Sequence, residues 1–116
     1  MNYDRIYNMK FADLYPNYVQ KALRKNKTQE EVDTIICWLT GHTHKTLKEV
    51  ISQQISVRSF FEQSPHFNEH AHLITGVICG VKIDEIEDPL MKKIRYLDKL
   101  IDELVRGKAM DKILRT

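Results

Sequence analysis

The sequence predicts an all-α fold: a small, compact multi-helix bundle of about five or six helices with orthogonal packing, in one domain that spans residues 1–116. Three observations predict it. Apolar residues recur at spacings of three and four along most of the chain, which is the period of an amphipathic helix. Residues that favour helix starts and stops bound these stretches. A hydrophobic fraction of 42% and a charged fraction of 29% are ordinary for a domain of 116 residues with a single core.

The first predicted helix lies in the N-terminal part of the chain. Asp13 is expected to cap it, and Pro16 falls in its first turn, where a proline is tolerated. The apolar face of this helix comprises Leu14, Tyr18, Val19, Ala22 and Leu23.

The second helix is expected over residues 29–40. Thr28 and Glu31 form a capping box, in which each side chain satisfies a free backbone amide of the first turn, and Gly41 ends the helix. The apolar face of this helix comprises Val32, Ile35, Ile36 and Leu39.

The middle of the chain predicts three more short helices. Thr43 is expected to cap one and Ser56 another. Their apolar residues are Leu47, Val50, Ile51 and Ile55 in the first, and Val57, Phe60 and Phe61 in the second. We also predict a helix within residues 68–80, although its isoleucines and valine favour strands, because a lone strand would have no partner. Gly76 and Gly80 are then explained by close helix packing.

The clearest helix is the long one that follows Asp88. Asp88 is its expected N-cap, and Pro89 takes the first helical position, where the missing amide hydrogen costs nothing. Its apolar stripe comprises Leu90, Ile94, Leu97, Ile101 and Leu104. Gly107 predicts a stop or a kink before a short terminal turn that docks through its apolar residues.

Composition restricts the compartment and the partners. No window approaches the roughly 18 apolar residues of a membrane span, and the N-terminus lacks the apolar core of a signal peptide, so we expect a soluble cytoplasmic protein. A net charge of +2 is too small to indicate a polyanionic partner. Cys37 and Cys79 lie in apolar runs, so we expect both to be buried thiols without a disulfide.

Three histidines, His66, His70 and His72, are the candidate metal ligands. Two imidazoles four residues apart on one helix face can bind one metal ion. However, His66 directly follows Pro65, and no H-E-x-x-H or C-x-x-C motif accompanies the cluster. Solvated surface histidines are the simpler interpretation. A bound metal would need neutral imidazoles and would be released below about pH 6.

A second candidate is a helix-turn-helix over residues 29–54, with its turn at Gly41. The charge of its second helix argues against DNA binding, because this helix offers only Lys45 and Lys48 together with the acidic Glu49. Contacts from basic residues to phosphates normally supply most of the non-specific affinity for DNA. Two helices joined by a short glycine turn are also common in any helical bundle. We therefore consider nucleic acid an unlikely partner.

The long last helix carries the remaining binding candidates. Arg95 and Asp98 are spaced as a helix surface pair, but a buried pair beside Tyr96 would equally line a small-molecule pocket. The sequence does not separate these interpretations. Cys79 is the candidate nucleophile or binding thiol, although a reactive thiolate needs a nearby cation and solvent access, and burial is the simpler expectation.

Two stretches resemble an uncharacterised bacterial family, the domain of unknown function 2200. The first runs from Met9-Lys10-Phe11-Ala12-Asp13-Leu14-Tyr15-Pro16 to Trp38-Leu39-Thr40-Gly41. The second runs from Leu73-Ile74-Thr75-Gly76-Val77-Ile78-Cys79-Gly80 through Glu87-Asp88-Pro89-Leu90-Met91 and Ile94-Arg95-Tyr96-Leu97-Asp98-Lys99-Leu100 to Arg115. The segment 42–72, which holds all five histidines, matches poorly. The resemblance implies a small helical protein of the bacterial cytoplasm and supplies no activity, cofactor or site residue.

The sequence therefore favours a non-enzymatic helical binding or interaction module that needs no cofactor. Its apolar stripes exceed what a chain this short is expected to bury, and an uncovered stripe is a natural interface for a partner protein or a second copy. The alternatives are a helix-turn-helix-like DNA-binding protein and a metal or enzymatic site that uses the histidines.

Overall fold

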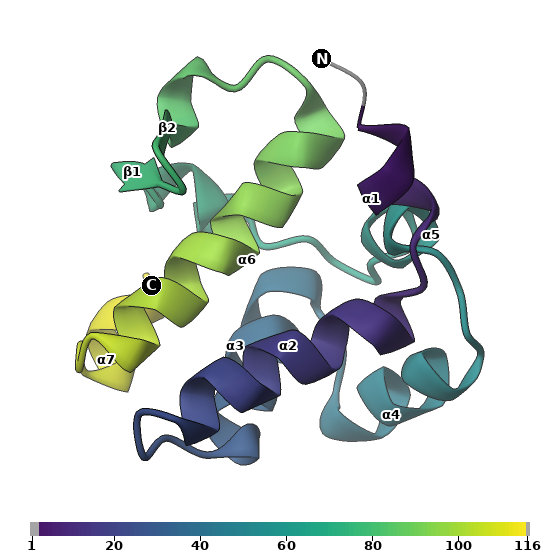
Figure 1. Ribbon diagram of the computed structural model, residues 1–116, viewed down its shortest axis with the longest axis horizontal. Helices are drawn as coiled ribbons and strands as arrows, with labels where there is room; N and C mark the ends of the chain where they lie inside the picture. The colour runs from purple at the N-terminus through teal and green to yellow at the C-terminus, as the bar shows by residue number, and fades with distance from the viewer. Residues whose placement is uncertain (1–2, 116) are drawn as a thin grey trace.

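The computed structural model describes residues 3–115 and confirms a compact, mostly helical fold (Figure 1). Within these residues, seven α-helices and two 3₁₀ turns surround one contiguous apolar core, and a small hairpin of two strands lies at one edge. The elements in chain order are α1 (Asp4–Asn8), α2 (Phe11–Leu23), α3 (Gln29–Thr40), α4 (His44–Ser52), α5 (Val57–Glu62), η1 (Glu69–Leu73), β1 (Val77–Ile78), β2 (Val81–Lys82), η2 (Ile83–Glu85), α6 (Pro89–Val105) and α7 (Met110–Ile113).

Helix α6 organises the core. It contacts α2, α3, α5, α7, η2 and the first strand of the hairpin, and Figure 1 shows it crossing the molecule diagonally. The predicted apolar stripe of this helix is buried throughout. Burial of these aliphatic side chains is the main favourable term that holds the surrounding elements together.

The predicted helix caps are confirmed where they depend on local chemistry. The Thr28 hydroxyl accepts from the Glu31 amide at 3.1 Å, and the Glu31 carboxylate accepts from the Thr28 amide at 2.9 Å. Thr43 forms a capping box with Thr46 at the start of α4, and the Ser56 hydroxyl accepts from the Ser59 amide at the start of α5. The carboxylate of Asp88 accepts two backbone amides at the start of α6, at 2.9 and 3.3 Å. Each cap satisfies amide groups that would otherwise lack a partner.

The predicted start of the first long helix is wrong. Helix α2 begins at Phe11, two residues before Asp13, and no side chain caps it. A contact with a distant segment sets this start, because the Phe11 amide donates to the Ile55 carbonyl at 2.9 Å and the Val57 amide donates to the Met9 carbonyl at 2.7 Å. This bridge between segments far apart in the sequence replaces the local cap.

The helix predicted within residues 68–80 is also wrong. Only a short 3₁₀ turn forms, and β1 and β2 follow as an antiparallel hairpin, so the strand does have a partner, which lies directly after it in the chain. Cys79 and Gly80 both have positive φ angles, +52° and +76°, which the tight two-residue turn between the strands requires. Gly76 also has a positive φ, and a Cβ at Gly80 would meet nothing. The glycines therefore serve the backbone conformation and not close helix packing.

The C-terminal turn docks as predicted. Gly107 breaks the helix with a φ of +91°, and Ile113 of α7 is fully buried. The buried carboxylate of Glu103 holds this end, because the Arg115 guanidinium donates to both of its oxygens at 2.6 and 2.7 Å and Lys108 approaches at 3.1 Å. This pairing keeps the pKa of Glu103 below its usual value.

Among residues 3–115, no helix combines the length and the apolar character needed to traverse a lipid bilayer. The longest helix, α6, has 17 residues and mixes its apolar stripe with charged side chains.

Candidate binding groove

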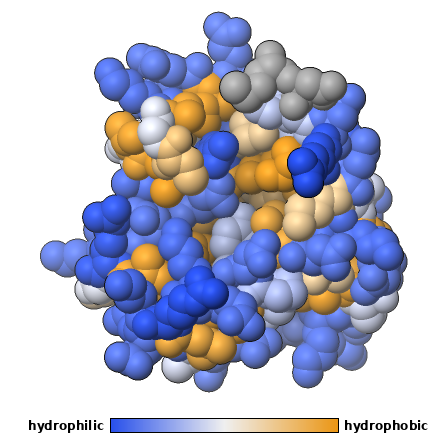
Figure 2. All heavy atoms as spheres, viewed as in Figure 1, coloured by the Kyte–Doolittle hydropathy of each residue, from blue (hydrophilic) through white to orange (hydrophobic). Residues whose placement is uncertain are grey.

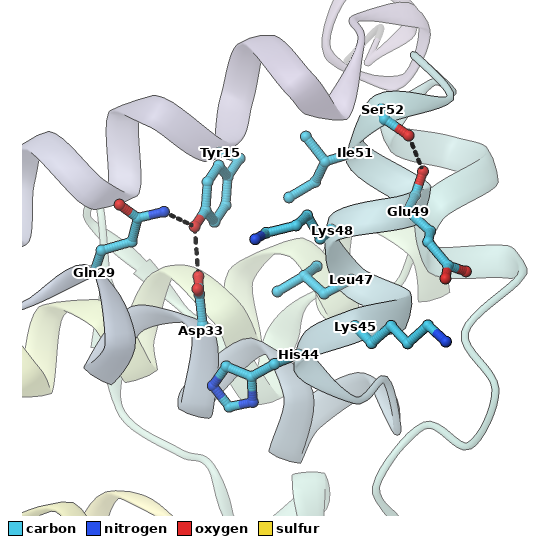
Figure 3. Close-up of a pocket in the computed structure, with 10 residues that line it drawn as sticks. All are labelled: Tyr15, Gln29, Asp33, His44, Lys45, Leu47, Lys48, Glu49, Ile51 and Ser52. Carbon is cyan, nitrogen blue, oxygen red and sulfur yellow. Dashed lines mark hydrogen bonds between the residues drawn. The ribbon is translucent and has the colours of Figure 1, made fainter.

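An open groove of about 770 Å³ lies between α2, α3 and α4 (Figure 3). We call it the α4 groove. Its lining residues are Tyr15, Gln29, Asp33, His44, Lys45, Leu47, Lys48, Glu49, Ile51 and Ser52. Its volume falls within the range of sites that bind ligands, roughly 300–1,000 Å³.

One face of α4 forms a wall of the groove. His44, Leu47, Lys48 and Ile51 stand at positions i, i+3, i+4 and i+7, which places them on one side of a helix. Figure 3 shows Leu47, Lys48 and Ile51 directed toward α2 and α3, whereas Lys45 and Glu49 point away. Leu47 is buried at the bottom of the wall and Ile51 is half-buried. The groove therefore has an apolar base with one lysine above it.

The opposite wall carries a hydrogen-bonded chain of three polar side chains. The Tyr15 hydroxyl of α2 donates to Asp33 Oδ1 of α3 at 2.5 Å, and Gln29 Nε2 donates to the Tyr15 oxygen at 2.9 Å. Partial burial, followed by the bond to Asp33, raises the pKa of Tyr15 well above its usual value of 10.0. The phenol therefore stays protonated at neutral pH and is a poor general base. This chain shapes the wall and is not arranged to activate a nucleophile.

The charges of the groove lie on separate walls. Within residues 3–115, neither Lys45 nor Lys48 forms an ion pair, and Asp33 has none either. Asp33 accepts the hydrogen bond from the Tyr15 hydroxyl. Lys48 thus presents an unpaired ammonium to the space between the walls.

The structure separates the binding candidates on α6. The predicted Arg95–Asp98 pair forms at 3.2 Å, but Tyr18 of α2, and not Tyr96, completes it by donating to Asp98 at 2.6 Å. Tyr96 is buried on another side of α6, with its ring 6.4 Å from that of Phe67. Burial is the main cause that raises the pKa of Asp98, and the bonds from Tyr18 and Arg95 oppose it. This network links α2 to α6.

The prediction that both thiols are buried is wrong for Cys79. It is exposed in the tight turn between β1 and β2, where its φ is positive. Cys37 is half-buried, and burial raises its pKa, which makes it a poor nucleophile.

The three candidate metal ligands do not converge. Across residues 3–115, no three side chains of His, Cys, Asp or Glu lie close enough together to hold a metal ion. His66 is exposed in the loop after α5, where its backbone amide donates to the Thr40 carbonyl. The rings of His70 and His72 lie 6.5 Å apart, and Nδ1 of His72 is 2.7 Å from a backbone carbonyl.

The two helices of the predicted helix-turn-helix, α3 and α4, do form and contact each other across the turn at Gly41. Gly41 has a φ of +83°, and a Cβ there would lie 2.6 Å from the backbone of His66. The glycine is therefore required for the fold whether or not nucleic acid binds.

Sequence reasoning did not identify Tyr15, Gln29, Asp33 or His44 as site residues. They come from three helices, and only the tertiary structure brings them together. One usable signal was the stripe on α4, because Leu47 and Ile51 share their helix face with Lys48, which is unusual for a face that packs entirely into a core.

Two other surface features compare poorly with the α4 groove. A hollow of about 450 Å³ beside Asp88 is lined by three carboxylates, and none of the described residues that line it is basic. Exposed apolar side chains also gather at the hairpin, where Val77 is 51% and Val81 38% exposed, and Figure 2 shows apolar atoms over this region. Val81 also lines the hollow beside Asp88.

Comparisons with known proteins agree on the family and the fold. The model of the family described as "Uncharacterized protein conserved in bacteria (DUF2200)" matches residues 5–115. The crystal structure of uncharacterized protein SP1917 superposes on this one with a TM-score of 0.91. The two sequences are 40% identical, and the match covers 98% of this chain and 93% of SP1917. No curated protein matches.

Proposed function

We propose a function from the geometry of the α4 groove, because the chain belongs to the bacterial family DUF2200, whose description names no activity. The proposal is that the protein is a non-enzymatic interaction module, and that a short segment of a partner protein binds in the α4 groove. The observation that carries it is the face of α4 on which Lys48 and the half-buried Ile51 border open space, next to the buried Leu47.

The composition of the α4 groove supports a protein segment as the occupant. Protein interfaces combine an apolar centre with a polar rim, and aromatic side chains are enriched in them. Here Ile51 provides the apolar surface that an occupant can contact, because Leu47 is almost fully buried, and Tyr15 provides an aromatic ring on the facing wall. Because Gln29 and Asp33 hold the Tyr15 hydroxyl, the wall is preorganised, and binding loses little additional side-chain entropy there.

The same wall supports binding over catalysis. A catalytic site needs a nucleophile or a proton-transfer group near its working pKa. In the α4 groove the Tyr15 phenol is held protonated and hydrogen-bonded on both sides. Neither cysteine lines the groove.

A selection experiment tests the proposal. Random peptides displayed on phage are selected against the protein, and the affinities of the recovered peptides are measured for Ile51→Ala and Val50→Ala. These two residues are adjacent in α4 and both half-buried, but only Ile51 lines the groove, so Val50→Ala is the matched control. We expect Ile51→Ala to weaken binding about tenfold and Val50→Ala to leave it unchanged.

Equal affinities for the two variants, or a selection that recovers no binding peptide, would contradict the proposal. A second copy of the chain is the competing partner. Sedimentation of the purified protein distinguishes the two partners. If the protein sediments as a dimer and Ile51→Ala dissociates that dimer, the groove serves self-association and not peptide binding.

We further propose that the protein acts in the bacterial cytoplasm. Its two cysteines are unpaired, which suits a reducing compartment. Cell fractionation tests this: recovery with periplasmic or membrane markers would contradict it.

A further inference from the structure

We infer that the segment bound in the α4 groove carries a carboxylate beside an apolar side chain, and that this carboxylate pairs with the ammonium of Lys48. This inference rests on the proposed function of the groove and specifies the chemistry of its occupant.

The position of Lys48 is the first step. Its side chain extends from α4 across the groove toward Tyr15 and Asp33 (Figure 3), and within the described part of the chain it has no ion-pair partner. An apolar occupant would remove water from this ammonium without supplying new hydrogen bonds or an opposite charge. Burying an unpaired charge is costly, so a fitting occupant must supply an anion there.

The other charged groups of the groove fix where that anion lies. Asp33 on the α3 wall is already engaged by the Tyr15 hydroxyl, and its negative charge repels a second carboxylate from that wall. Glu49 and Lys45 point away from the space between the walls. The carboxylate of the occupant is therefore directed toward α4, which gives the bound segment one orientation.

The apolar part of the occupant follows from the neighbours of Lys48. Leu47 precedes it in the chain and Ile51 lies one helical turn further along the same face. One turn is about 5 Å, so a segment that reaches Lys48 with a carboxylate places a nearby side chain over the half-buried Ile51. Acidic and apolar residues are thus expected at adjacent or closely spaced positions.

A double-mutant cycle tests the pairing. The probes are the peptides selected on the wild-type protein, resynthesised with each Asp or Glu replaced by Asn or Gln. Their dissociation constants are measured by isothermal titration for the wild type, for Lys48→Gln and for Lys21→Gln. Lys21→Gln is the matched control, because it removes the same charge from an exposed side chain on α2 that does not line the groove.

We expect one carboxylate replacement to weaken binding about fivefold in the wild type and in Lys21→Gln, and to have no effect in Lys48→Gln. If Ile51→Ala weakens the peptides but the carboxylate replacement costs the same in all three proteins, the inference is wrong and the proposed function stands. If Ile51→Ala weakens none of them, the proposed function fails and the inference fails with it. Displacement of the peptides by duplex DNA would also overturn it.

Discussion

Replacing Tyr18 by Phe tests whether the network of Tyr18, Asp98 and Arg95 stabilises the fold. The phenol donates to Asp98 at 2.6 Å, Tyr18 is buried, and the Asp98 side chain is only 20% exposed. Without the hydroxyl, the carboxylate keeps Arg95 and gains little water. A hydrogen bond to a charged group contributes about 1.5–3 kcal/mol, so we expect Tyr18→Phe to lower the free energy of unfolding by about 2 kcal/mol.

Tyr15→Phe is the matched control for this variant. It removes the same group from an equally short bond to a carboxylate, Asp33, but that site borders the open α4 groove, where water replaces the hydroxyl. We expect a loss of about 1 kcal/mol. Urea unfolding followed by circular dichroism measures both, and a difference of about 1 kcal/mol is resolved with urea slopes of about 1–3 kcal/mol per molar.

The pH dependence provides a second readout for Tyr18→Phe. Burial raises the pKa of Asp98 above its usual 3.8, so ionising Asp98 costs folding free energy as the pH rises through the folded-state pKa. The Tyr18 hydroxyl opposes that cost because it stabilises the ionised form. The loss caused by Tyr18→Phe should therefore be about 2 kcal/mol at neutral pH and about 1 kcal/mol near pH 3. Equal losses for the two tyrosine variants, or a loss that does not change with pH, would refute this reasoning.

Three further changes have definite expected outcomes. Gly41→Ala should destabilise the protein by more than about 2 kcal/mol, measured by thermal unfolding, because its φ is +83° and the new Cβ would lie 2.6 Å from the backbone of His66. Cys79 should react with iodoacetamide well before Cys37, followed by mass spectrometry, because Cys79 is exposed and burial raises the pKa of Cys37. The pKa of Glu103 is lowered in the folded state, so its ionised form stabilises the fold at pH values above its usual pKa of 4.5. This contribution is lost as the pH falls through the folded-state pKa. Glu103→Gln should therefore make the free energy of unfolding depend less on pH in the acid range.

Local chemistry decided which parts of the fold could be predicted. Thr28 and Asp88 cap helices through bonds to amides two or three residues away, so their role is readable from a short window of sequence. The start of α2 was not readable, because it depends on hydrogen bonds from Phe11 to Ile55 and from Val57 to Met9. No local pattern reports a contact between segments that lie more than forty residues apart.

The hairpin and the α4 groove were missed for related reasons. The strand at Ile78 lies in a stretch whose apolar spacing also fits a helix, and only the positive φ at Cys79 and Gly80 makes the tight turn that pairs it. The groove depends on which side of α4 stays uncovered once α2 and α3 are in place. The sequence indicates that Leu47 and Ile51 share a face with Lys48, but not that Tyr15 stands opposite them.

The most direct test of the α4 groove as the binding site is a titration of the isotope-labelled protein with a selected peptide, followed through its backbone amide resonances. We predict that the largest chemical-shift changes fall on residues 44–52 and on the amides of Tyr15 and Asp33, and that Ile51→Ala needs about tenfold more peptide to reach them. Changes centred instead on the exposed hairpin at Val77 and Val81, with α4 unmoved, would contradict the account.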